Sequence, residues 1–306
     1  MNRASIDIGS NSLLLLVVDS EGVTLHDEAR VVSLGKGLGD RGLFRPDRMI
    51  EALGVLGEFA QTARGLGVAA AEIRAVATSA ARRALNATSF FDKVREATGI
   101  VVRVIAGEEE AQLTWQGALG QLNLPEGPIC VVDLGGGSTE VVLGLGHRIR
   151  QRSSLEIGTV RLTEQFFGST VDRYRPTDLA RLRAHIDAIV ATLRWPELPR
   201  SLVAVAGTAT TLAAMELRLL RYDRTKVHGY RLTRAALRRW TDQLLHASPE
   251  ERRLMAAISP ERADYLLAGA VVLETVATAV HKDSLRVSDG GVRHGLLVDP
   301  QALGAA

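Results

Sequence analysis

Short apolar runs alternate along the chain with longer segments in which apolar residues recur at helical spacing. Runs such as "LLLLVV", "IRAVA", "ICVV" and "SLVAV" are typical of buried strands. A helix is predicted from Pro46, because Met49, Leu53, Leu56 and Phe59 recur at helical spacing and proline suits a first turn. Strands that alternate with helices indicate an α/β protein.

The remaining pattern extends this alternation to the end of the chain. An extended stretch is expected over 22–33 and a glycine-rich loop over 34–44. Helices are expected around 178–193, from Thr210, over 234–246 and within "RADYLLAGAVVLETVATAV". The last strand, "SLRVSDGG", leads into a final short helix.

One hydrophobic and polar pattern occurs twice. "IDIGSNSLLLLVVD" and "VVDLGGGSTEVVLG" each consist of an apolar run, an Asp, a Gly-containing turn and a second apolar run. Asp7 aligns with Asp133, and Gly9 aligns with Gly135. The repeat predicts two similar domains, and the Pro- and Gly-rich "NLPEGP" marks a boundary between them. We therefore expect domains over 1–124 and 125–306.

The first repeat also invites comparison with a secretory signal. Its apolar run is shorter than the roughly 7 to 15 residues of a signal core, and polar residues flank it on both sides. No stretch is long enough for a transmembrane helix. The single Cys130 suits a reducing compartment and reads as a buried thiol. These features predict a cytoplasmic protein.

The net charge excludes some classes of partner. A formal charge of +2 on 306 residues is too small to indicate nucleic acid or a membrane surface. A basic stretch from Arg218 to Arg239 is the exception. It could hold a chain of phosphates, or it could be a solvated basic helix face.

Three glycine-containing turns are candidates for binding a polyanion. Each follows an apolar strand, and glycine lets backbone N–H groups approach phosphate oxygens closely. The turns contain Gly9, Ser10, Asn11 and Ser12; Gly135, Gly136, Gly137, Ser138 and Thr139; and Gly207 and Thr208. The third runs into a helix, whose N-terminus favours anions. The alternative is three ordinary tight turns with hydroxyl caps.

Carboxylates accompany these turns. Asp7 and Asp133 end apolar strands, where a charge without a partner is costly. Glu140 lies on the return strand of the second hairpin, which folds it back toward Asp133. Oxygen ligands of this kind favour Mg²⁺, although Glu140 could also be a structural hairpin partner.

A further acidic cluster begins the helix "GEEEAQL". A carboxylate on its inner face could act as general base on a water that attacks a terminal phosphoryl group. Three acids at a helix start also complement the helix dipole at the surface. Spacing alone does not choose among Glu108, Glu109 and Glu110.

Taken together, the motifs resemble the exopolyphosphatase and guanosine pentaphosphate phosphohydrolase (Ppx/GppA) family. The matching stretches include "IDIGSNSLLLLVVD", "VATSAAR", "GEEEAQL", "VVDLGGGSTEVVLG", "LEIGTVRLTEQF", "VAGTATTLAA" and "VSDGGVRHGLL", in the family's order. The resemblance implies two ribonuclease-H-like domains of the actin, Hsp70 and sugar-kinase superfamily that flank a cleft. It also implies hydrolysis of terminal phosphoanhydride bonds with Mg²⁺.

The resemblance assigns roles by position. It makes Glu110 the catalytic glutamate, and it makes Asp133 and Glu140 the carboxylates that support the metal. Phosphate contacts fall on the three turns listed above together with Asp7, and on Arg82, which ends "TSAAR". Two departures are Ser79, where Asn is commoner, and His294, where Glu is commoner.

We therefore expect an exopolyphosphatase that removes the terminal phosphate of polyphosphate. Alternatives are a guanosine pentaphosphate 5′-phosphohydrolase and a weakly catalytic sensor that binds guanosine penta- or tetraphosphate. A sugar kinase or Hsp70-like ATPase also fits the fold plan alone. The family makes a homodimer plausible.

Overall fold

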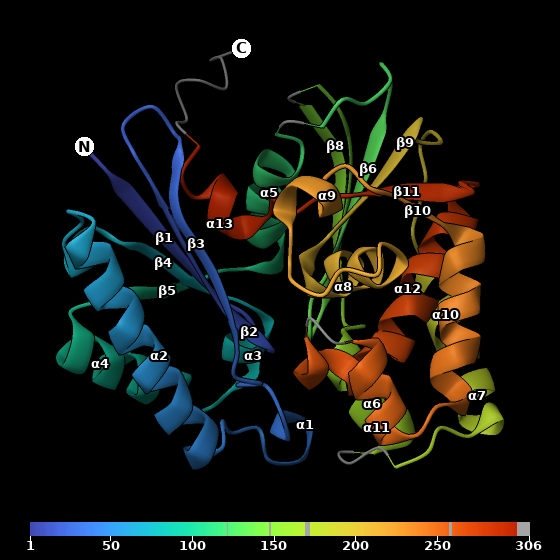
Figure 1. The fold of residues 1–306 in the computed structure, drawn as a ribbon, viewed down its shortest axis with the longest axis horizontal. Helices are drawn as coiled ribbons and strands as arrows, with labels where there is room; N and C mark the ends of the chain where they lie inside the picture. Colours follow the sequence, from blue (N-terminus) through green and yellow to red (C-terminus); the bar gives the residue numbers. More distant parts are fainter. Residues whose placement is uncertain (121, 147, 169–171, 257–258, 299–306) are drawn as a thin grey trace. The chain divides into compact units, whose positions relative to one another are not determined.

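The computed structural model describes residues 1–120, 122–146, 148–168, 172–256 and 259–298 (Figure 1). It divides into two compact units. Unit 1 comprises Met1–Gly117 and the described residues from Val292 onward, and unit 2 comprises Ala118–Gly291. The division after Gly117 thus comes slightly before the predicted boundary at 124. The last described segment, predicted with the second domain, packs in unit 1 because α13 (Val292–Gly295) contacts β1 and β2.

Unit 1 is built on a five-stranded mixed sheet in the order β3-β2-β1-β4-β5. β2 pairs antiparallel with β1 and β3, whereas β4 and β5 run parallel to β1. The bounds are β1 Arg3–Ile8, β2 Ser12–Val18, β3 Thr24–Val31, β4 Arg74–Ala77 and β5 Val102–Val104. This is the strand order of a ribonuclease-H-like sheet.

The "LLLLVV" run lies on β2, which is buried on both sides. Leu13, Leu15 and Val17 belong to the main core of unit 1, whereas Leu16 and Val18 pack with Leu297 on the other face. Side chains alternate between the two faces of a strand. A continuous apolar run is therefore what a strand covered on both faces requires.

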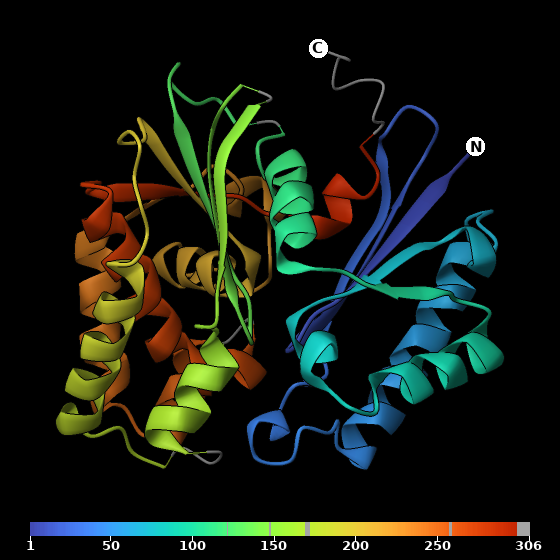
Figure 2. The same ribbon diagram turned by 180° about the vertical axis from the view of Figure 1, so that it is seen from behind.

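Helices cover both faces of the unit 1 sheet. α2 and α4 lie side by side on one face (Figure 2), and Leu56 and Phe59 of α2 are fully buried there, as their spacing predicts. On the other face, Leu113 of α5 packs with Val292 and Leu296. The bounds are α1 Leu38–Arg41, α2 Pro46–Gly65, α3 Ser79–Arg83, α4 Ala87–Thr98 and α5 Gly107–Ala118, with a 3₁₀ turn at Ala70–Glu72.

Unit 2 repeats the plan with one extra strand. Its sheet has the order β10-β11-β9-β6-β7-β8, in which β8-β7-β6-β9-β11 matches β3-β2-β1-β4-β5 of unit 1. The bounds are β6 Ile129–Leu134, β7 Thr139–Leu145, β8 Arg148–Leu155, β9 Ser201–Val205, β10 Arg231–Thr233 and β11 Ser284–Val287. The predicted internal repeat is therefore a repeat of topology.

A buried helix, α12, organises the core of unit 2. α12 packs against α6, α7, α8, α10 and β6, and almost all of its residues are buried. The bounds are α6 Thr159–Phe167, α7 Pro176–Val190, α8 Ala206–Glu216, α9 Arg224–Val227, α10 Arg234–His246, α11 Pro249–Met255 and α12 Leu266–Ala279, with a 3₁₀ segment at Pro260–Tyr265. Cys130 is buried, as predicted, and burial raises the pKa of its thiol to about 12.

Most predicted elements are present. The helix predicted from Thr210 begins earlier, at Ala206, so Gly207 and Thr208 lie in its first turn. The glycine-rich segment 34–44, predicted as a loop, contains the single-turn helix α1. Gly37 and Gly42 flank this turn in left-handed conformations and limit it to four residues. None of the helices in the described ranges has the length and apolar character needed to span a bilayer.

Candidate functional site

The first glycine turn joins β1 to β2 and is held by backbone hydrogen bonds. The Gly9 N–H donates to the Ser12 carbonyl at 2.9 Å, which closes the turn. The Gly35 N–H donates to the Ser10 carbonyl at 2.7 Å, and the Ser33 N–H donates to the Asn11 carbonyl at 2.8 Å. The segment after β3 thus donates backbone hydrogen bonds to carbonyl groups of the turn. Asp7 lies at the end of β1, paired in register with Leu14.

The second turn has the same closure. The Gly135 N–H donates to the Ser138 carbonyl at 3.0 Å, and the Thr139 hydroxyl donates to the Ile157 carbonyl. Ser138 and Thr139 are buried. This turn is therefore as well fixed as the first.

Helix α6 begins directly behind the second turn. The Val160 N–H donates to the Gly136 carbonyl at 2.9 Å. A Cβ at Gly158 would lie 2.3 Å from the Gly137 nitrogen, a distance that no side chain tolerates. Gly158 is therefore required for this packing. Gly158 lies in "LEIGTVRLTEQF", one of the stretches that resemble the family, but it was assigned no role from the sequence.

Asp133 and Glu140 lie together in unit 2. They are direct cross-strand partners on β6 and β7, so their side chains project from the same face of the hairpin. Both are buried, and the Ser154 hydroxyl donates to Glu140 Oε1 at 2.7 Å. Within the described ranges, no three acids, histidines or cysteines converge on a metal site. Two carboxylates nevertheless fit Mg²⁺, which keeps several waters and substrate oxygens as ligands.

The third turn joins β9 to α8 through a strained residue. Ala206 has φ 71°, in the left-handed region that L-residues other than glycine seldom adopt. Among the described side chains, none caps the first turn of α8. Thr208 is buried in this first turn. Such strain is typical of functional turns, where surrounding packing maintains it.

Arg262 lies over this turn. A Cβ at Gly207 would lie 1.3 Å from the Arg262 guanidinium Nη1. Any larger residue at position 207 would therefore displace this guanidinium. Withdrawal from water lowers the pKa of Arg262 from its ordinary value. In the sequence, Arg262 is the first residue of the segment "RADYLLAGAVVLETVATAV", which was predicted to contain a helix, and it received no functional role. The signal was present: an Arg that precedes the most apolar helix of the chain.

The structure distinguishes among the three acids of "GEEEAQL". Glu110 is 7% exposed, and its Oε2 accepts a hydrogen bond from Arg82 Nη1 at 2.7 Å. Glu109 instead pairs with Arg103 at the surface, and this hydrogen bond lowers the pKa of Glu109. Glu108 is exposed. Burial and the partner single out Glu110, which spacing could not do.

Arg82, expected to contact phosphate, is bound to protein groups on α5 and the loop before it. Besides Glu110, its Nη1 donates to the Ile105 carbonyl at 3.0 Å. One turn earlier on α3, the Ser79 hydroxyl is buried and has no hydrogen-bond partner among the described residues. Unit 1 thus brings together a carboxylate, a guanidinium and an unsatisfied hydroxyl.

The basic stretch from Arg218 to Arg239 is mostly internally neutralised. Its charged members form ion pairs with acids of unit 2: Arg224–Asp289, Lys226–Asp223, Arg234–Asp283, Arg238–Glu274 and Arg239–Glu216. Arg231 donates to the Ser284 hydroxyl. Within the described part of the chain, Arg218 and Arg221 form no ion pair. Most of these basic side chains therefore form ion pairs within unit 2. This role differs from both interpretations of the sequence, a phosphate-binding stretch and a solvated helix face.

The model of the Ppx/GppA phosphatase family matches residues 16–302. The chain belongs to this family. A curated Ppx/GppA relative from Mycobacterium tuberculosis, Exopolyphosphatase 2, is 35% identical, with 96% of each chain covered. The predicted phosphoanhydride hydrolase is thereby confirmed at the level of the phosphatase family.

Solved Ppx/GppA structures share the fold. The Aquifex aeolicus family member is 36% identical, with a TM-score of 0.80 over 97% of this chain and 96% of its own. An exopolyphosphatase from Cytophaga hutchinsonii is 28% identical, with a TM-score of 0.86 over 96% of both chains. Together with the two matching sheets, these structures confirm the predicted α/β fold with two similar domains.

Proposed function

We propose that this Ppx/GppA member is an exopolyphosphatase, which hydrolyses the terminal phosphoanhydride bond of inorganic polyphosphate. The observation that carries the proposal is the buried Glu110, held by Arg82, in a chain 35% identical to a protein named Exopolyphosphatase 2. A carboxylate that is buried and oriented by a guanidinium has one defined position, which a general base requires.

Glu110 acts on the attacking water in this proposal. Its carboxylate accepts a hydrogen bond from the water and takes a proton as the water oxygen bonds to the terminal phosphorus. The bond from that phosphorus to the bridging oxygen breaks, and the shortened polyphosphate leaves. Arg82 acts as a positioning residue through its contacts with Glu110 Oε2 and the Ile105 carbonyl.

The three turns and their neighbours bind the remaining phosphates. Backbone N–H groups of the turns at Gly9–Ser12, Gly135–Thr139 and Gly207–Thr208 donate to phosphate oxygens, except those of Gly9 and Gly135, which close their own turns. The guanidinium of Arg262, lying over Gly207, adds a positive charge at the third turn. The Ser79 hydroxyl gains a partner when a phosphate oxygen reaches it. Because phosphoryl transfer needs little covalent help from the protein, this positioning supplies much of the acceleration.

Asp133 and Glu140 are the residues that would hold Mg²⁺. When bound, Mg²⁺ offsets negative charge on the transferring phosphoryl group. The two acids orient by cross-strand pairing, and Ser154 holds one oxygen of Glu140. Asp7 has no acid opposite it in unit 1, since its partner in register is Leu14.

The test compares two substrates and two matched variants. Purified protein is assayed with Mg²⁺ on polyphosphate and on guanosine pentaphosphate. We expect Glu110→Gln to lower turnover by about 100-fold or more, with the fold intact by circular dichroism. Glu109→Gln, one residue away at the surface, should retain nearly full activity.

Three outcomes would contradict the proposal. Near wild-type turnover in Glu110→Gln would remove its catalytic role. Faster release of phosphate from guanosine pentaphosphate than from polyphosphate would assign the chain to the alternative substrate. Tight binding of guanosine tetraphosphate without any hydrolysis would indicate a sensor instead.

A further inference from the structure

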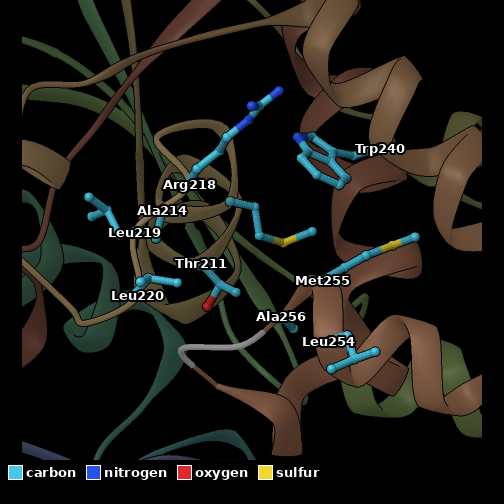
Figure 3. Close-up of a pocket in the computed structure, with 10 residues that line it drawn as sticks. Thr211, Ala214, Arg218, Leu219, Leu220, Trp240, Leu254, Met255 and Ala256 are labelled. Carbon is cyan, nitrogen blue, oxygen red and sulfur yellow. The ribbon is translucent and has the colours of Figure 1, made fainter.

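Unit 2 contains a cavity of about 250 Å³ at the C-terminal end of α8 (Figure 3). α8, the segment after it, α10 and α11 contribute its lining. The apolar lining includes Met215, Leu219, Trp240, Leu254 and Met255. Among the described lining residues, Arg218 is the one charged side chain. In Figure 3, Arg218 and Trp240 lie toward one end of the lining, and Leu254 and Ala256 lie toward the other.

Arg218 occupies a backbone position that normally belongs to glycine. Helix α8 ends in a Schellman motif: the Leu219 N–H donates to the Ala214 carbonyl at 3.0 Å, and the Arg218 N–H donates to the Met215 carbonyl at 3.1 Å. Arg218 therefore adopts φ 51°, which is costly for any residue with a Cβ. The motif holds the Arg218 side chain beside the cavity.

The charge of Arg218 is not neutralised by its acidic neighbour. Glu216, two residues earlier, accepts a hydrogen bond from Trp240 Nε1 at 2.6 Å and pairs with Arg239. Within the described ranges, Arg218 forms no ion pair, unlike most basic residues that follow it. The cavity thus combines an apolar lining with one available positive charge.

The cavity also has an apolar border open to solvent. Leu220 is 90% exposed and Leu254 is 76% exposed, and both belong to its lining. Adjacent exposed side chains of this size mark binding sites more often than scattered single ones do. The third glycine turn is elsewhere, because it lies at the other end of α8, a helix of 11 residues whose two ends are about 16 Å apart.

We propose that this cavity is a second ligand site, which takes a small anion with an apolar aromatic body. Met215, Leu219, Met255 and the Trp240 indole cover the apolar body, and Arg218 pairs with the acidic group. The volume lies slightly below the range of roughly 300–1,000 Å³ for drug-sized ligands, which selects compact molecules. This site does not depend on the proposed reaction.

The first experiment uses 1-anilinonaphthalene-8-sulfonate, which carries two aromatic groups and one sulfonate. The probe is titrated into the wild-type protein, and its fluorescence gives a Kd. Arg218→Gln should weaken binding about tenfold, as expected for loss of one charge-assisted contact. Arg221→Gln is the matched control, because Arg221 is exposed, forms no ion pair in the described part of the chain and is outside the lining. It should change the Kd less than twofold.

Two further measurements separate binding from folding. N-phenyl-1-naphthylamine, which lacks the sulfonate, should bind the wild-type protein and Arg218→Gln equally. Arg218→Gly should raise the Tm by about 2 °C, because glycine suits the left-handed position. It should still weaken the binding of the anionic probe about tenfold. Together, these two results would show that Arg218, compared with glycine, lowers stability and increases the affinity for an anion. A residue with a purely structural role would not have this pair of effects.

Three results would overturn the proposal. The first is equal affinity of the anionic probe for the wild-type protein and Arg218→Gln. The second is an equal loss of affinity in Arg221→Gln. The third is a halved mass in size-exclusion chromatography with light scattering for Leu254→Asp, which would assign this surface to contact with a second copy.

Discussion

The turn that follows β1 and the turn that follows β6 are two copies of one backbone design. The Gly9 N–H donates to the Ser12 carbonyl at 2.9 Å, and the Gly135 N–H donates to the Ser138 carbonyl at 3.0 Å. The two copies differ at a single decisive position. Asp7 pairs in register with Leu14, whereas Asp133 pairs with Glu140. The fold therefore repeats the geometry of the turn, and only the second hairpin places two acids opposite each other, the pair that we propose for Mg²⁺.

The two turns also differ in what supports them. In unit 1 the support is an irregular segment after β3, where a Cβ at Gly35 would lie 3.0 Å from the Ser10 Cβ. In unit 2 the support is the start of helix α6, where a Cβ at Gly158 would lie 2.3 Å from the Gly137 nitrogen. The second turn is thus packed more tightly, against backbone that cannot move aside. Tight support is suited to the turn that lies next to the paired acids.

Making the second hairpin resemble the first should have the largest effect. Glu140→Leu copies the residue of unit 1, and we expect turnover on polyphosphate to fall by about 100-fold or more, since a metal ligand is lost. Glu140→Gln should raise the Mg²⁺ concentration for half-maximal activity by about 10- to 100-fold. A phosphate-release assay over a Mg²⁺ titration measures both.

The control is the matched position of unit 1. Leu14→Met conserves volume and should cost less than about 1.5 kcal/mol of stability, with turnover unchanged. Near wild-type activity in Glu140→Leu would mean that the difference between the hairpins has no chemical consequence.

The supporting glycines give the next largest contrast. Gly158→Ala should lower the free energy of unfolding by about 3 kcal/mol, because its Cβ meets backbone atoms that must shift. Gly35→Ala should cost about 1 kcal/mol, since its contacts need to give only a few tenths of an ångström. Urea denaturation measures both values. Equal losses would show that the two supports are equivalent.

The smallest expected effect concerns the strand-to-helix corners. At the corner between β4 and α3 in unit 1, no described non-glycine residue has a positive φ, whereas Ala206 at the start of α8 has φ 71°. Ala206→Gly should raise the free energy of unfolding by about 0.5 kcal/mol, because the relief of left-handed strain exceeds the entropic cost of glycine. Ala209→Gly, inside α8, should lower it by about 1 kcal/mol. If both variants lose stability equally, the corner is not strained.

The local pattern was sufficient for most elements of the fold. α10 has the predicted bounds, because its apolar spacing and the Thr233 cap are contained in the segment itself. The single turn of α1 was not predicted, since it depends on two glycines in left-handed conformations within a segment that reads as a loop. The structure groups the described segment after Gly291 with unit 1, whereas the sequence pattern grouped it with the second domain, because its packing partners lie near the other end of the chain.

Some features of the candidate site could likewise be predicted from the sequence, and others could not. By itself, the sequence determined the α/β class, the repeated hairpin and the residue types of the turns, because these depend on periodicity and on neighbours in the chain. Only the tertiary structure decided that Glu110 is the buried acid on Arg82, that Gly158 admits α6, that Arg262 lies over Gly207, and that most of the basic stretch is neutralised. These depend on contacts between residues far apart in the sequence, and no local pattern encodes such distances.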